Sequence, residues 1–427
     1  MHKRLIIINL IILLSFYFTA TAQKQINSPY ARFNIGALEP QGSFKSRGMG
    51  GIGTGMRDNT SIYQINPASY SSLDTNSFTF DFGFDFGLSV LREGENRYTS
   101  NDMNFNHLFM GFPIKKGWGI ATGIAPVSYG FYNITDEVLE GDSNYDPLTG
   151  AYSEFHAGKG GLSNYFLGTG VNITRNFSAG INMTIMFGVL ERNYSLQFED
   201  VENFYHNSSS EKIRVRGINF DYGIQYMAKI SDDYFLNAGI AITSGKTYKS
   251  DYDNVVIRTS AYNAVDTVAY TSEKSTPVYL PGNYKIGISF GKLNKFTTGF
   301  DYIAADWSKS EIPGYSGYAA DTRTFRWGLE VIPDKYANFS FIKRMEYRFG
   351  AHIGDNYLIV NGEQVKEMGA SFGIGIPMIR SLSRATLFVD YTMKNGSEAS
   401  GLHNERLITI GGSLNIYDFW FIKRKYN

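Results

Sequence analysis

The sequence predicts an all-β protein, a transmembrane antiparallel β-barrel of about fourteen strands with an N-terminal segment that plugs its lumen. Three observations lead to this prediction. The chain begins with a secretory leader, its long segments alternate apolar with small or polar residues, and short turns alternate with long polar loops along it. Together these features are typical of a barrel in the outer membrane of a Gram-negative bacterium.

The first 22 residues have the features of a cleaved signal peptide. Lys3 and Arg4 precede an apolar run from Leu5 to Phe18, and Ala20-Thr21-Ala22 supplies the small residues needed for cleavage. The alternative is a retained membrane anchor, but the apolar run is shorter than the ~20 residues of a spanning helix. We therefore expect an exported mature chain that starts near Gln23.

Composition narrows the class of protein further. The 427 residues contain no cysteine, which excludes disulfides and thiolate metal sites, and the net charge of zero implies no nucleic-acid partner. The chain is rich in glycine and aromatic residues, with 45 Gly, 30 Tyr and 32 Phe. Aromatic side chains suit the girdles of a membrane barrel, and glycine suits crowded positions in its lumen.

The clearest alternation lies in residues 77–90. Large apolar side chains from Phe78 to Val90 occupy every second position, and Thr, Asp, Gly and Ser residues lie between them. A period of two places all the apolar side chains on one face of a strand. Similar patterns predict strands at 77–91, 104–114, 117–133, 163–174, 177–195, 213–230, 234–248, 274–291, 294–306, 322–332, 344–353, 366–376, 384–393 and 405–418.

The connections between these strands favour a barrel over a soluble sandwich. Short turns follow the second, fourth, sixth and eighth strands, and longer polar loops, most clearly 134–162, 196–212 and 249–273, follow odd-numbered ones. Bacterial outer-membrane barrels have short periplasmic turns and long outer loops, and their strand number is even. We therefore expect an outer-membrane location with both termini in the periplasm, in contact with outer-membrane lipid.

Residues 23–76 show no sustained alternation and are expected to form a separate hatch ahead of the barrel at 77–427. A lumen of about fourteen strands admits solvent unless something fills it. The stretch Gly48-Met49-Gly50-Gly51-Ile52-Gly53 formally matches a dinucleotide-binding fingerprint, but no βαβ unit surrounds it, so no cofactor is expected. These glycines instead suit close packing inside the lumen.

The same segment resembles the start of the FadL/TodX (OmpP1) family. The resemblance rests on the hatch motif Arg47, Gly48, Met49, Gly50 and Gly51, on Asp58-Asn59, and on the turn at Asn66, Pro67 and Ala68. It implies a fourteen-stranded barrel with an N-terminal hatch that takes up hydrophobic molecules such as long-chain fatty acids, which leave through a lateral opening at a kinked wall strand. A different alternative comes from Tyr347-Arg348-Phe349-Gly350 through Gly375-Ile376-Pro377, which resembles a FadL-like subgroup common in the Bacteroidetes. Some barrels of that kind are protein-partner subunits of secretion or assembly complexes, the type IX secretion shuttle protein among them.

Alternation also predicts which charged side chains face the lumen. A structural network that holds the hatch is expected, with a selectivity filter as the alternative, because lipid-facing basic side chains cost roughly 2–4 kcal/mol at the bilayer midplane. The residues assigned to this lumen polar network are Asp81, Asp85, Asp221, Arg326, Arg348, His352 and Glu367.

The third predicted strand contains a candidate lateral opening. Gly123, Pro126 and Gly130 interrupt its pattern, and proline cannot donate a ladder hydrogen bond. The residues predict either a kink with an opening or a bulge that only adjusts curvature.

No residue pattern supports an enzyme. The five histidines of the mature chain show no metal-binding spacing, so neither catalytic residues nor a metal site is expected. Two functions remain. The first is a FadL-like channel for a small hydrophobic ligand, which predicts an apolar pocket between hatch and wall, and the second is a non-catalytic subunit of an outer-membrane complex, which predicts a sealed lumen.

Overall fold

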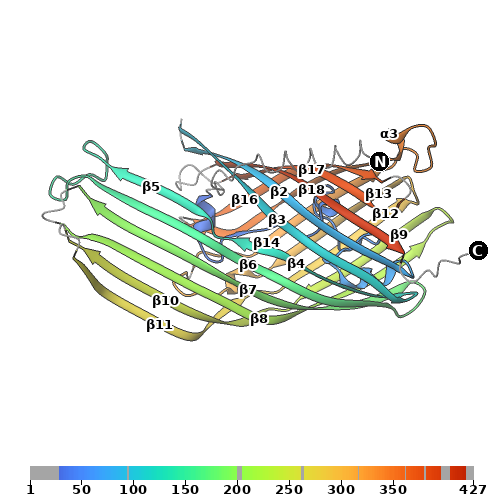
Figure 1. Ribbon diagram of the computed structural model, residues 1–427, viewed down its shortest axis with the longest axis horizontal. Coiled ribbons are helices and arrows are strands. Elements are labelled where there is room, and N and C mark those ends of the chain that lie inside the picture. Colours follow the sequence, from blue (N-terminus) through green and yellow to red (C-terminus); the bar gives the residue numbers. More distant parts are fainter. Residues whose placement is uncertain are drawn as a thin grey trace, which may run out of the picture.

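The computed structural model describes residues 28–93, 96–199, 204–260, 264–315, 317–360, 362–378, 381–395 and 404–419. The expected signal peptide at 1–22 lies outside these residues. The described chain forms a closed antiparallel β-barrel whose strands run obliquely to its long axis (Figure 1). Within the described chain, no helix has the length and apolar character needed to cross a membrane.

The strands belong to a single sheet, and every pairing in it is antiparallel. They are β1 (Ala37–Leu38), β2 (Ser77–Glu93), β3 (Asn96–Lys115), β4 (Trp118–Tyr129), β5 (Tyr132–Val138), β6 (Tyr152–Asn172), β7 (Phe177–Phe198), β8 (His206–Lys229), β9 (Tyr234–Thr243), β10 (Lys246–Thr259), β11 (Val265–Leu280), β12 (Asn283–Lys292), β13 (Phe296–Ala305), β14 (Thr322–Val331), β15 (Glu346–Val360), β16 (Glu363–Pro377), β17 (Arg384–Asn395) and β18 (Asn404–Phe419). Short helices are η1 (Pro29–Arg32), α2 (Phe44–Arg47), η2 (Pro67–Ser72), η3 (Trp307–Lys309) and α3 (Phe341–Arg344).

Fourteen positions make up the wall, which confirms the predicted strand number. The count follows because β1 belongs to the N-terminal segment and not to the wall, while β5 continues β4 along β6, β10 continues β9 along β8, and β11 leads into β12. The barrel closes where β18 pairs with β2, from Asn404 opposite Arg92 to Phe419 opposite Ser77. Each of the fourteen predicted strands corresponds to one of these positions.

The three long segments predicted as loops are wrong in large part, because strand structure continues into them. Residues 132–138 and 152–162 form β5 and the start of β6, residues 206–212 start β8, and β10 and β11 occupy most of 249–273. Figure 1 shows these strands extending past the others at one end of the barrel. Their outer portions carry no apolar alternation because solvent reaches both faces, as in β11, where residues 265–275 are all exposed.

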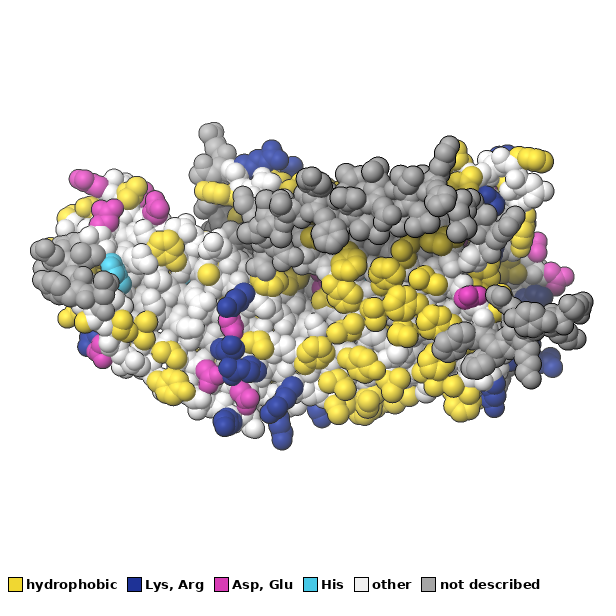
Figure 2. Space-filling model, in the orientation of Figure 1, with side chains coloured by type: hydrophobic (Ala, Val, Ile, Leu, Met, Phe, Trp, Pro, Cys, Tyr) yellow, Lys and Arg dark blue, Asp and Glu magenta, His cyan; other side chains and the backbone are white. Residues whose placement is uncertain are grey.

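The outer face carries an apolar belt. Its exposed large side chains come from every second residue of neighbouring strands, as alternation predicted; examples are Phe84, Phe86, Ile218, Phe220, Tyr222, Ile224, Ile240, Ile286, Ile288, Phe325, Trp327 and Phe349. Figure 2 shows this hydrophobic area over one part of the barrel, with Lys, Arg, Asp and Glu side chains gathered beside it. An exposed apolar surface of this kind matches a lipid-facing barrel wall.

The N-terminal segment, residues 28–76, packs against inward-facing residues of the wall. Most of its side chains are buried, and η2 contacts β4, β6, β7 and β8. The inner faces of these and other strands carry glycines, and a side chain there would collide with atoms of the N-terminal segment; these are Gly119, Gly170, Gly180, Gly223, Gly239, Gly328 and Gly350. The glycine content of the sequence therefore serves the close approach of this segment to the wall.

Candidate functional site

The N-terminal segment is held by side chains that project from the wall into the lumen. The Asp301 carboxylate accepts hydrogen bonds from the backbone N–H groups of Gly53 and Thr54, both at 2.8 Å. Gln225 donates to the carbonyl oxygens of Thr54 at 2.9 Å and Met56 at 3.0 Å. The wall strands thus satisfy backbone groups that a segment without regular secondary structure would otherwise leave unpaired.

The hatch motif lies at the tightest contact between the segment and the wall. Gly50 and Gly51 have φ values of 69° and 81°, a region that suits glycine. A Cβ on Gly50 would lie 2.5 Å from the Trp327 carbonyl oxygen and 2.8 Å from that of Ala351. Met49 is fully buried beside these glycines, and the Arg326 guanidinium donates to the Gly51 carbonyl oxygen at 3.0 Å.

The turn at Asn66 joins the segment to itself and to the wall. Asn66 caps η2, since its side-chain oxygen accepts from the Ala68 N–H at 3.1 Å, and Pro67 occupies the first helical position. The Asn66 amide also donates to the Thr54 carbonyl oxygen at 2.8 Å and the Ile224 carbonyl oxygen at 3.1 Å. One side chain therefore fixes both the helix start and its position on β8.

A buried chain of ion pairs links the segment to β14, β15 and β17. Lys45 pairs with Asp58 and lies 3.8 Å from Glu330, and Arg384 lies 3.8 Å from Asp58. Glu330 pairs in turn with Arg348. Burial by itself would raise the pKa of Asp58, but the Lys45 and Arg384 charges outweigh it and hold that pKa below its ordinary range. Asp58 is therefore ionised and anchored.

A second ion-pair group lies where β1 meets the wall. The Arg47 guanidinium is 2.8 Å from a Glu39 oxygen and 3.2 Å from an Asp85 oxygen, and Asn106 donates to both carboxylates. Burial raises the pKa of Glu39 to about 7, although the Arg47 charge favours the ionised form. This group connects the N-terminal segment to the middle of β2 and β3.

The wall is interrupted between β3 and β4. The two strands pair from Lys115 opposite Trp118 up to Leu108 opposite Ile124, and the structure, which describes all of 96–138, records no β3–β4 pairing beyond that point. From there β4 pairs with β6 on one side and with β1 on the other, where Leu38 lies opposite Ser128. The β4–β6 ladder has a bulge just after Pro126. The bulge alternative thus corresponds to the irregularity after Pro126, and the gap in the β3–β4 ladder is the place where a lateral opening would have to lie.

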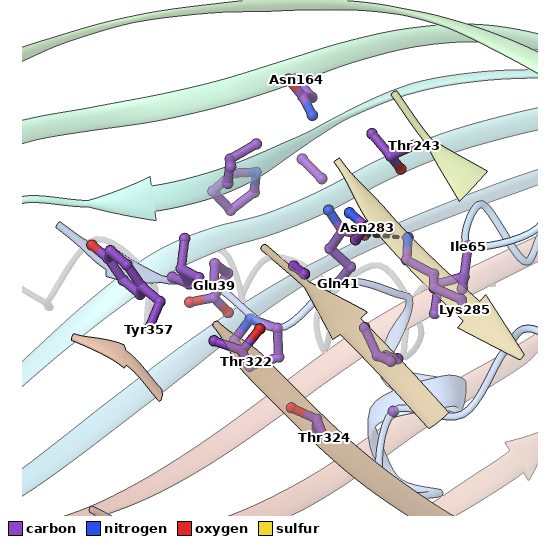
Figure 3. Close-up of a pocket in the computed structure, with 18 of the residues that line it drawn as sticks. Glu39, Gln41, Ile65, Asn164, Thr243, Asn283, Lys285, Thr322, Thr324 and Tyr357 are labelled. Carbon is purple, nitrogen blue, oxygen red and sulfur yellow. Dashed lines mark hydrogen bonds between the residues drawn. The ribbon is translucent and has the colours of Figure 1, made fainter. Parts of the chain in front are cut away.

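A cavity of about 310 Å³ lies beside this interruption, between the N-terminal segment and the wall. Figure 3 shows its polar side, where Gln41, Asn283 and Lys285 lie close together and Lys285 donates to Gln41 at 3.3 Å. The other side is apolar and includes Leu38, Ala125, Pro126, Val127 and Phe166. The channel hypothesis predicted an apolar pocket. This prediction is wrong in part, because the wall strands also contribute polar side chains such as Asn283 and Lys285 to the cavity.

An apolar cluster in the lumen borders the cavity and supplies some of its lining, including Ile35, Tyr248 and Tyr357. Tyr30 and Ile35 of the N-terminal segment pack there with side chains of β6, β7, β8, β10, β11 and β15, among them Leu190, Ile213 and Val278, each at most 2% exposed. Trp307 of η3 covers this cluster from the connection between β13 and β14. The cavity is therefore bordered by this apolar cluster and by the part of β4 that no longer pairs with β3.

The sequence-predicted lumen residues do face inward, but they fall into different groups. Asp85 and Arg326 hold the N-terminal segment, and Arg348 joins the ion-pair chain; Asp81 lies 3.2 Å from His107, away from the cavity. Asp221, Arg326, His352 and Glu367 line the cavity. Sequence reasoning missed Glu39, Lys45, Gln225, Glu346 and Arg384 as partners, because alternation assigns a face to a residue and not a neighbour.

Gly123 and Gly130, the two glycines of the candidate lateral opening, have different surroundings in the structure. Gly123 faces inward where a side chain would collide with β3, and Gly130 lies between β4 and β5, its N–H donating to the Gly160 carbonyl oxygen at 2.9 Å. Within the described chain, no group of three or more His, Asp or Glu side chains is arranged to hold a metal ion.

The closed fourteen-strand antiparallel barrel is the fold of the FadL/TodX hydrocarbon channels. A family model named BamG matches residues 1–427, and the chain belongs to that family. No curated protein of known function matches it.

Solved structures with this fold share little sequence with the chain. The CymD monoaromatic hydrocarbon channel is 14% identical with a TM-score of 0.59, covering 90% of this chain and 98% of that chain. A Pseudomonas aeruginosa FadL homologue is 12% identical with a TM-score of 0.57, covering 89% and 98%. The toluene transporter TodX of Pseudomonas putida is 14% identical with a TM-score of 0.56, covering 91% and 99%. CymD is described as a channel and TodX as a transporter, and neither is described as an enzyme.

Proposed function

We propose that this protein is an outer-membrane channel for small molecules that have an apolar body and a polar end, fatty acids among them. The observation that carries the proposal is the position of the cavity. Ala125, Pro126 and Val127, where β4 has left β3, also line the cavity. A molecule in the cavity thus lies beside the part of β4 that has left β3 and pairs with β1, and in this proposal it leaves laterally into the bilayer there.

The two sides of the cavity suit the two ends of such a molecule. Lys285 and Arg326 can receive a carboxylate, and the apolar side beside Leu38 and Phe166 can receive a hydrocarbon chain. The cavity volume of about 310 Å³ falls at the small end of the range for ligand sites. A ligand longer than the cavity would extend into the β3–β4 interruption.

In this proposal residues 23–76 act as the hatch and residues 77–427 as the barrel, after removal of the signal peptide at 1–22. The anchoring of the segment by Asp301, Gln225 and the Asp58 ion pairs supports a hatch that stays seated. We further propose that the termini are periplasmic, with the long extensions of β6–β8, β10 and β11 at the cell surface, and that the chain represents the Bacteroidetes-type subgroup that its sequence resembles.

Binding of palmitate to the purified barrel, followed by native mass spectrometry in mild detergent, tests this function. Lys285→Gln should weaken palmitate binding about tenfold, a factor typical of losing one charge-assisted contact. Lys292→Gln is the matched control, because Lys292 ends the same strand outside the cavity. Equal palmitate binding by both variants and the unmodified protein, or no binding at all, would sink the channel proposal.

A second candidate function is a non-catalytic subunit of an outer-membrane secretion or assembly complex. The packed apolar cluster in the lumen favours it, since a subunit needs no path for a solute. Mass spectrometry of the protein extracted from its own membrane separates the two candidates. A lone barrel with a mass of lipid size supports the channel, and a stoichiometric assembly with an empty barrel supports the subunit.

A further inference from the structure

Basic side chains on the outer face meet the apolar belt along β6, β7, β8 and β10. Figure 2 shows Lys and Arg gathered at this edge of the hydrophobic area. Furthest from the belt, Lys159 and Lys212 both pair with Glu191, and Arg214 pairs with Asp253 at 2.6 Å. These charges are neutralised within the wall itself.

Arg216 and Lys249, in contrast, are not neutralised by a neighbouring carboxylate of the described chain. They lie directly opposite each other on β8 and β10, both exposed, and among the described residues neither has an ion pair or side-chain hydrogen bond. Cross-strand neighbours have Cβ atoms about 4.5–5.5 Å apart, and like charges at that separation repel. A neighbouring carboxylate would relieve the repulsion, as Glu191 does directly opposite Lys212, but no carboxylate of the described residues pairs with Arg216 or Lys249.

The pair lies at the margin of the belt. Ile218, the next residue of β8 on the outer face, is 48% exposed, and Phe187, which lies directly opposite Arg216 on β7, is 40% exposed. Further along β8 the belt continues through Phe220, Tyr222 and Ile224. Two unneutralised cations thus adjoin a continuous apolar surface at the depth where headgroups meet hydrocarbon.

We propose that Arg216 and Lys249 form a binding site for the phosphate group of an anionic membrane lipid, whose acyl chain lies against Phe187 and Ile218. A phosphate between the two cations removes their mutual repulsion. Arg216 can bind two phosphate oxygens through its planar guanidinium, and Lys249 adds a point charge. The adjacent apolar side chains explain why the ligand is a lipid rather than a free anion.

The test is titration of the purified barrel with dioleoyl phosphatidic acid in a neutral detergent, read by native mass spectrometry. The variant Arg216→Gln/Lys249→Gln should bind the lipid about tenfold more weakly. The matched control is Lys159→Gln/Lys212→Gln, which removes the same charge from the same face but from groups already paired with Glu191. The control should keep at least half of the affinity of the unmodified protein.

Two further probes complete the test. Dioleoylglycerol, which lacks the phosphate, should not bind at this site, and inorganic phosphate alone should compete only weakly. A thermal readout is independent of mass spectrometry: phosphatidic acid should raise the melting temperature of the unmodified protein more than that of the pair variant. The proposal is overturned if the two double variants lose binding equally, if dioleoylglycerol binds as well, or if inorganic phosphate competes fully and so indicates an anion site only.

Discussion

Arg348 and Glu330 lie opposite each other on β15 and β14 inside the barrel, and the Arg348 Nε donates to a Glu330 oxygen at 2.7 Å. Arg348 has no solvent exposure and also pairs with Glu346. Because Lys45 lies 3.8 Å from the same Glu330 oxygen, the contact joins two wall strands to the N-terminal segment. Wall and segment therefore form one buried electrostatic unit.

Removing this arginine should destabilise the whole barrel. Arg348→Met would leave two buried carboxylates without their main partner, and breaking a buried pair in this way costs about 3–5 kcal/mol. The free energy of unfolding, measured by urea titration of the detergent-solubilised barrel, should fall by that amount. Arg323→Gln, an exposed position on neighbouring β14, should change it by less than about 0.5 kcal/mol. Similar losses for both variants would contradict the assigned role of Arg348.

Gly50 should not tolerate a side chain. Gly50→Ala combines an unfavourable positive φ with contact against the backbone of β14 and β15. Gly150→Ala is the matched control, because Gly150 has a φ of 68° but open space around it. We expect the control to lose about 1 kcal/mol and Gly50→Ala to lose clearly more, measured as the shift in unfolding temperature. Equal shifts would show that the wall does not press on Gly50.

Asp301 should control how firmly the N-terminal segment is held at Gly53 and Thr54. Asp301→Ala removes the acceptor for the N–H groups of Gly53 and Thr54 and leaves these buried donors unpaired, at a cost of about 1–3 kcal/mol. Hydrogen exchange of residues 50–57 should speed up while exchange in β7 and β8 stays unchanged. The control is Asp233→Ala, in an exposed turn. Unchanged exchange in residues 50–57 would contradict the anchoring role.

A disulfide between β1 and β4 should show whether the N-terminal segment moves during function. Leu38 and Ser128 lie directly opposite each other, a spacing that a disulfide can bridge, and the chain has no other cysteine. Because the proposed hatch stays seated, oxidised Leu38→Cys/Ser128→Cys should keep palmitate uptake into proteoliposomes, and a loss of uptake that reductant restores would contradict this. The control pair is Ile181→Cys/Tyr222→Cys, within the wall. Full uptake by the oxidised protein would mean that the hatch stays in place.

Much of the barrel could be predicted because a membrane wall repeats one local rule. Residues such as Phe84 and Asp85 alternate because one face contacts lipid and the other the lumen, so the strand positions, the short turns and the inward charges follow from the chain alone. The alternation is lost where a strand has no face in contact with lipid. In β10 and β11 solvent reaches both faces, and the sequence suggested loops where strands continue.

The sequence by itself determined the fold class, the fourteen wall positions, the inward direction of residues such as Arg326 and Arg348, and the irregularity at Pro126. Only the tertiary structure decided which charges pair, that β1 takes the edge of β4 that β3 leaves free, and that the cavity is polar on one side. The physical reason is that alternation depends on the immediate neighbours in the chain. An ion pair between Lys45 and Asp58, or a contact between Leu38 and Ser128, depends instead on how barrel closure brings distant segments together.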